Sequence, residues 1–172
     1  MPFVTHSLMA HQIALEAELL RCGFDVGYYE KRDIERWADK QIAAIDNPRA
    51  ELLDLSMLRQ VHPHDVMNKL KSLASSAPSS STRTRIGFVG LALNRKRISL
   101  TNAIRLLDEM TSVPGVTEEE ASRIYCLDDA RDLAIAGISG NLADVERELH
   151  NFLSPYADEL AAGELRFLPL QE

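Results

Sequence analysis

Apolar residues recur at helical spacing through most of the chain, and this repetition limits the fold more strongly than any other feature of the sequence. Within residues 31–46, Ile34, Trp37, Ala38, Ile42 and Ile45 are separated by three, one, four and three positions, which places them on one face of a helix. Charged residues occupy the remaining faces of this segment. Other segments repeat the pattern, so the sequence predicts an all-α fold.

Local start and stop signals divide the chain into separate helices. Thr117, followed three positions later by Glu120, has the pattern of a capping box, and Asn141 is a suitable N-cap. The Ser154-Pro155 step is typical of a helix start and predicts a short last helix. We therefore predict a bundle of eight or nine helices, over residues 7–21, 31–46, 48–58, 63–74, 85–93, 99–111, 117–136, 141–153 and 154–163.

The segment over residues 85–93 fits either a buried strand or a tightly packed helix, because periodicity cannot separate the two over so short an apolar run. An isolated strand would have no partner in a helical chain, which favours the helix. Gly87 and Gly90 within it resemble the GXXG loop of KH domains only in spelling, since Phe88 and Val89 between them require burial. We interpret the two glycines as positions where two helices pack closely.

A serine-rich stretch over residues 75–84 separates the helices into two groups and predicts a flexible loop. Each group is small for an independent domain. We therefore predict a single helical domain over residues 1–172, with one lobe at 1–74 and a second at 85–172.

Charge is distributed unevenly along the chain. The net charge of −7 combines +4 up to Leu107 with −11 from Asp108 to the end. No acid lies between Asp65 and Asp108, where eight residues are basic. Such asymmetry indicates the charge of a partner rather than a fold, although the two parts could also neutralise each other within the folded chain.

Residue patterns that would indicate catalysis or cofactor binding are absent from the sequence. It contains neither a phosphate-binding glycine loop nor a nucleophile elbow. His62-Pro63-His64 has no further His or Cys nearby to complete a metal site, and a capped helix start explains it as well. We predict a protein that is not an enzyme, with no catalytic residue, metal or cofactor.

The N-terminal stretch lacks the features of a signal peptide, and no run approaches the roughly 18 apolar residues of a membrane span. Two cysteines, Cys22 and Cys126, are too few for a disulfide framework. These observations predict a cytoplasmic protein without membrane contact.

The stretch from Asp33 to Ile42, DIERWADKQI, followed by Asn47-Pro48 and then LLDLS at residues 52–56, resembles the N-terminal helices of small bacterial immunity proteins. These helical antidotes are encoded beside toxins of contact-dependent inhibition or polymorphic toxin systems. The resemblance covers about a third of the chain and implies an all-α inhibitor that occludes a cognate toxin without chemistry. It transfers no individual functional residue.

The acidic C-terminal half is compatible with that function, because toxins that cut nucleic acid are often basic and an acidic surface speeds their capture. We predict a basic toxin domain as partner, bound by residues of the last helices: Glu118, Glu119, Glu120, Asp128, Asp129, Asp132, Asp144, Glu146 and Glu148.

A second hypothesis is a nucleic-acid-binding regulator that uses the basic stretch over residues 66–107. An acidic pI near 5.3 and the absence of a helix-turn-helix pattern count against it. Another protein-binding adaptor remains equally compatible with the residues.

Overall fold

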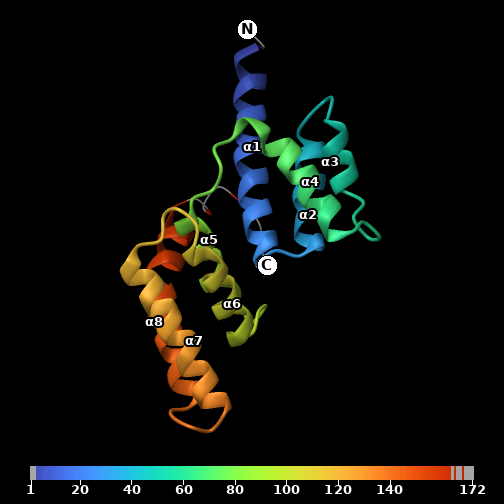
Figure 1. Ribbon diagram of the computed structural model, residues 1–172. Coiled ribbons are helices and arrows are strands. Elements are labelled where there is room, and N and C mark those ends of the chain that lie inside the picture. The colour runs from blue at the N-terminus through green and yellow to red at the C-terminus, as the bar shows by residue number, and fades with distance from the viewer. Residues whose placement is uncertain (1–2, 164, 166–167, 169–172) are drawn as a thin grey trace. The chain divides into compact units, whose positions relative to one another are not determined.

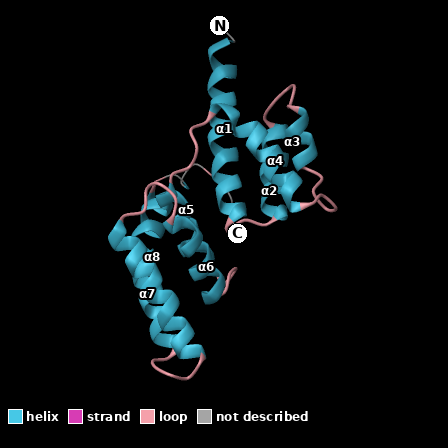
Figure 2. Ribbon diagram, viewed as in Figure 1, coloured by secondary structure: helices cyan, strands magenta, loops and turns pink. Residues whose placement is uncertain are grey.

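The computed structural model describes residues 3–163, 165 and 168, with side chains described from Leu8 onward, and within this part the regular structure is entirely helical (Figures 1 and 2). The all-α prediction is confirmed. The elements are α1 (Phe3–Asp25), α2 (Lys31–Ala43), α3 (Ala50–Leu55), α4 (Pro63–Leu73), a 3-10 helix (Ala74–Ser76), α5 (Thr82–Asn94), α6 (Leu100–Thr111), α7 (Glu118–Ile135) and α8 (Leu142–Ala162).

The chain divides into two compact units. Unit 1 contains α1 to α4 and the 3-10 helix, and unit 2 contains α5 to α8 together with the short segment Val26–Tyr28. The division after Ser80 falls inside the stretch that the sequence predicts as a loop. That loop is shorter than predicted, because Ser81 caps α5 and the helix begins at Thr82. The hydroxyl of the buried Thr82 donates a 2.7 Å hydrogen bond to the carbonyl oxygen of Pro114.

Most predicted helix starts are confirmed, and their capping bonds explain why. The Thr117 hydroxyl accepts from the backbone N–H of Glu120, and the Glu120 carboxylate accepts from that of Thr117. Asn141 caps α8 by accepting from the backbone N–H of Asp144 at 2.9 Å. These bonds satisfy N–H groups that have no partner within the helix. Residues 85–93 lie inside α5, which settles that segment as helix.

Several predicted boundaries are wrong. α1 spans Phe3–Asp25 rather than residues 7–21, α2 ends at Ala43 rather than at residue 46, and α3 spans Ala50–Leu55 rather than residues 48–58. A separate helix does not start at Ser154-Pro155, because α8 runs without interruption to Ala162 with Pro155 inside it. A proline in a helix interior removes one backbone hydrogen bond. Pro155 is exposed, whereas its neighbours Leu153 and Tyr156 are buried, so packing of this turn offsets the lost bond.

The core of unit 1 contains Trp37, which is 2% exposed, as its place on the apolar stripe predicts. Its indole N–H donates to the carboxylate of Glu16 on α1 at 2.7 Å, and Gln41 and Gln12 each donate to that carboxylate at 2.9 Å. Glu16 is itself buried, so these three donors replace the water that it loses. Helical spacing alone did not predict this network.

The core of unit 2 is centred on the packing of α5 against α8. A Cβ atom on Gly87 would lie 2.7 Å from the Tyr156 carbonyl oxygen, and one on Gly90 would lie 3.1 Å from the Cβ of Ala157. The two glycines therefore allow the helices to approach closely, as the sequence predicts. α7 packs against α6 and α8, so α7 and α8 form a helical hairpin that lies side by side in Figure 1.

Candidate functional site

The nine predicted partner-binding acids all lie on the α7–α8 hairpin. The two helices together contain eleven Asp or Glu and three Arg, a net charge of −8. Six of the nine acids are exposed and three are half-buried. The exposed ones are Glu118, Glu119, Asp129, Asp132, Glu146 and Glu148.

Glu120, one of the half-buried acids, has a structural role. Besides capping α7, its carboxylate accepts a hydrogen bond from the Tyr156 hydroxyl and lies 3.7 Å from the guanidinium of Arg83. Burial alone would raise the pKa of Glu120, but the hydrogen bonds from Thr117 and Tyr156 outweigh it, and the pKa is lowered. The pKa of Tyr156 is raised to about 12, mainly by burial of its hydroxyl and also by the hydrogen bond that this hydroxyl donates to Glu120. Arg83 also stacks over the Tyr156 ring at 4.7 Å, so these groups tie α5, α7 and α8 together.

Four further acids are engaged within the hairpin. Arg131 pairs with Asp128 at 2.8 Å and with Asp132 at 2.7 Å, while Asp144 pairs with Arg147 at 2.5 Å. The Glu146 carboxylate lies 3.9 Å from the ring Nε2 of His150. Ion pairs on an exposed surface are weak, so a basic partner can compete for these carboxylates. Glu118, Glu119, Asp129 and Glu148 have no ion pair within the described part of the chain and are the acids most available to a partner.

The structure places the nine acids in two groups along the hairpin. Glu118, Glu119 and Glu120 lie at the start of α7, about 12 to 15 Å from Asp128 along the helix at the helical rise of 1.5 Å per residue. The second group, from Asp128 to Glu148, lies toward the loop that joins the helices, with Glu148 farthest from this loop, beside Ser122 and Arg123 of α7. In the view of Figure 1 this loop lies beyond the ends of α5 and α6. No residue from Asp128 to Asp144 is buried.

The loop end of the hairpin also exposes apolar side chains, which the sequence analysis missed. Leu133, Ile135, Ile138 and Leu142 are between 42% and 73% exposed. Gly137 and Gly140 both have positive φ angles and are typical of a loop, but residue types alone do not distinguish an exposed isoleucine from a core one. This apolar cluster, called the hairpin tip below, is next to the second acidic group.

The basic stretch over residues 66–107 does not form one surface of a single unit. Lys69 lies in unit 1, where it pairs with Asp54 at 2.5 Å. In unit 2, Arg105 pairs with Glu109, and Arg95 stacks over the Tyr28 ring at 4.8 Å. Several of the cations are therefore already engaged by groups of their own unit, as Arg83 is.

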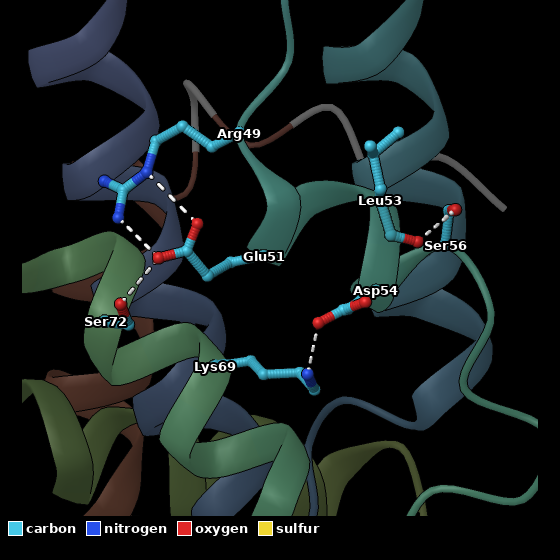
Figure 3. A network of polar contacts seen from close by, with 7 residues as sticks. All are labelled: Arg49, Glu51, Leu53, Asp54, Ser56, Lys69 and Ser72. Carbon is cyan, nitrogen blue, oxygen red and sulfur yellow. Dashed lines mark hydrogen bonds and ion pairs between the residues drawn. The ribbon is translucent and has the colours of Figure 1, made fainter.

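Unit 1 has a groove of about 430 Å³ at the end of α2. At its rim, Arg49 donates to Glu51 at 2.7 Å, and the Ser72 hydroxyl donates to the same carboxylate oxygen at 2.9 Å, which links α3 to α4 (Figure 3). The hydrogen bonds lower the pKa of Glu51 to about 2, and the bond from Arg49 has the largest effect. The lining is largely apolar and contains neither His nor Cys: Met9, Ala10, Ile13, Ala44, Ile45, Asp46, Asn47, Arg49, Leu52, Leu73 and Ser76.

Groups that could support metal chemistry are not assembled in the part of the chain that the structure describes. Among those residues, no three His, Cys, Asp or Glu side chains are arranged to hold a metal ion. His62 is the N-cap of α4, and its ring Nδ1 accepts from the backbone N–H of His64 at 3.2 Å. None of the helices in the described part of the chain is both long enough and apolar enough to cross a membrane.

Comparisons of the chain with protein-family models, with curated proteins and with solved structures found no match. The resemblance of residues 33–56 to immunity proteins therefore stays a prediction.

Proposed function

We propose that this chain is a cytoplasmic binding protein without catalytic activity, that it captures a basic toxin domain on the α7–α8 hairpin, and that it neutralises the toxin by occlusion. One observation supports this above all. The two helices bear a net charge of −8, and most of their acids are exposed on a surface that the rest of unit 2 leaves uncovered.

Electrostatics gives such a surface a function in capture. A field of one sign raises the rate at which an oppositely charged protein associates, and this effect falls steeply as salt screens the charges. Fast capture is what an antidote needs, because a toxin acts as soon as it is free. A toxin domain that binds nucleic acid is itself basic, since its substrate is a polyanion.

The nucleic-acid-binding hypothesis has weaker support. Its basic stretch is divided between the two units, and Lys69, Arg83 and Arg105 are paired with carboxylates. Phosphate binding would have to break these pairs. The adaptor hypothesis uses the same acidic surface and differs only in that its basic partner is not toxic.

Genetic context and co-expression test the proposal directly. We expect a gene for a large secreted effector immediately beside the gene of this chain. Expression of the effector's toxic domain in a bacterial host should stop growth, and co-expression of this chain should restore it. Absence of such a neighbour, or growth arrest that the chain does not relieve, would contradict the proposal.

Charge reversal tests the surface. The variant Glu119→Lys/Asp129→Lys should slow association with the toxic domain at least tenfold at low salt. It should lower the free energy of unfolding by no more than about 1 kcal/mol, because both side chains are exposed and only Glu119 lies in the first turn of α7. The matched control is Asp39→Lys/Asp46→Lys, which reverses two exposed acids of unit 1. Equal association rates for the two variants, measured by surface plasmon resonance across a salt series, would remove the hairpin from the interface.

A further inference from the structure

The hairpin tip exposes more apolar surface than its position in the fold requires. Leu133 is 42% exposed, Ile135 61%, Ile138 73% and Leu142 44%, all within ten positions of one another. Single exposed apolar residues are normal on protein surfaces, whereas neighbouring ones mark a surface that another molecule covers. Unit 2 does not cover it, because no residue between Asp128 and Asp144 is buried.

The tip is held in a defined conformation by the ends of both helices. The N–H of Gly137 donates to the carbonyl of Ala134, and the N–H of Ile138 donates to that of Leu133 at 3.0 Å. With Gly137 at φ +67°, these two bonds form a Schellman motif, which ends α7 and fixes the residue that follows. Asn141 caps α8 on the other side of the loop. A preorganised tip loses little conformational entropy when it binds.

Charge around the tip restricts what can bind there. From Asp128 to Glu148 the chain has six acids and two arginines, a net charge of −4. A second copy of the tip would bring like charges together, and an anionic membrane surface would repel it. A protein that presents cations around an apolar pocket satisfies both the apolar and the acidic groups.

We infer that the hairpin tip is the anchor of the interaction: Ile135 and Ile138 enter an apolar pocket of a basic partner protein, and the acids next to the tip pair with cations at the rim of that pocket. This inference rests on the proposed function, because it names the part of the α7–α8 surface that holds the partner. Interfaces are dominated by a few buried anchors of this kind, with charged groups around them that set the rate and the specificity.

The test uses a defined probe, a fluorescein-labelled amphipathic helical peptide made of leucine and lysine, followed by fluorescence anisotropy at low salt. The unaltered chain should bind it, and should not bind the matched leucine–glutamate peptide. The variant Ile135→Ser/Ile138→Ser should weaken binding roughly tenfold or more, because each buried aliphatic side chain contributes about that factor. The control variant Leu8→Ser/Met57→Ser removes two equally exposed apolar residues of unit 1 and should stay within twofold.

Circular dichroism establishes that both variants are folded, as expected for substitutions at exposed positions. Equal affinities of the tip and control variants would overturn the inference, as would failure of the unaltered chain to bind the basic peptide. A dimer in size-exclusion chromatography that the tip variant abolishes would also overturn it, since the tip would then bind a second copy.

The co-expression assay separates this inference from the proposed function. If the unaltered chain protects the host and Ile135→Ser/Ile138→Ser protects equally well, the hairpin tip does not anchor the partner, and the proposed toxin-neutralising function is retained. If the unaltered chain gives no protection while the basic peptide still binds through the tip, the partner is not a toxin, and the anchoring role of the tip is retained.

Discussion

Gly87 provides the sharpest test of the packing in unit 2. In the variant Gly87→Ala the new Cβ would lie 2.7 Å from the carbonyl oxygen of Tyr156 and 3.1 Å from two side-chain atoms of Leu160. A backbone oxygen cannot rotate away, so α5 and α8 must separate locally. Overpacking of this kind costs about 1–3 kcal/mol, while alanine gains about 0.5–1 kcal/mol over glycine in a helix. We expect the free energy of unfolding to fall by about 1–2 kcal/mol.

Gly90 is the matched control on the same face of the same helix. Its Cβ would meet side-chain carbons of Ala157 and Leu153 at 3.1 and 3.2 Å, and the nearest carbonyl oxygen is 3.4 Å away. These Cβ atoms are fixed to the backbone of α8, but at 3.1 to 3.4 Å the two helices need to separate by only a few tenths of an ångström, less than at Gly87, so Gly90→Ala should change the free energy of unfolding by less than about 1 kcal/mol. Urea unfolding followed by circular dichroism gives the free energies, and hydrogen exchange in α5 and α8 assigns the change to unit 2. A rise in stability for Gly87→Ala, or a larger loss for Gly90→Ala, would refute the close approach of the two helices.

Three further predictions concern buried or hydrogen-bonded groups. Trp37→Phe removes one of three donors to the buried Glu16 and should lower the free energy of unfolding by about 1–3 kcal/mol; an unchanged urea midpoint by circular dichroism would contradict this. Glu51 has a pKa of about 2 in the folded chain against an ordinary 4.5, so its stabilising effect is complete above pH 4.5 and is lost as the pH falls toward 2. Glu51→Gln should flatten the fall in melting temperature over that range. Tyr156, with its pKa raised from 10 to about 12, stabilises the fold below pH 10 and loses this effect as the pH rises through 12, so Tyr156→Phe should reduce the loss of stability in strong base.

The hairpin combines two kinds of group that act at different stages of binding. Exposed acids such as Glu119 and Asp129 act over a distance and control how fast a basic partner arrives. Apolar side chains at the tip act only after contact and control how slowly it leaves. Salt should therefore change mainly the association rate, and substitution at the tip should change mainly the dissociation rate.

Sequence reasoning predicted the helices because their determinants are local. The Thr117–Glu120 capping box, the Asn141 cap and the apolar stripe around Trp37 each involve residues within a turn or two of one another, and all three are present in the structure. The acids of α7 and α8 were also predicted as a surface, because charged side chains are rarely buried. The sequence did not predict which of these acids cap a helix, which form ion pairs and which are available to a partner.

Three other features of the protein depend on tertiary contacts that the sequence pattern does not contain. Pro155 is accommodated within α8 because the turn around it packs into unit 2, a contact that the local Ser-Pro pattern cannot contain. The donor network on Glu16 joins residues 12, 16, 37 and 41 from two helices. Leu133 and Ile138 are of the same residue types as the core, and helical spacing shows only that one face is apolar. Whether another element covers that face depends on where the neighbouring helices end, and at the hairpin tip none of unit 2 reaches it.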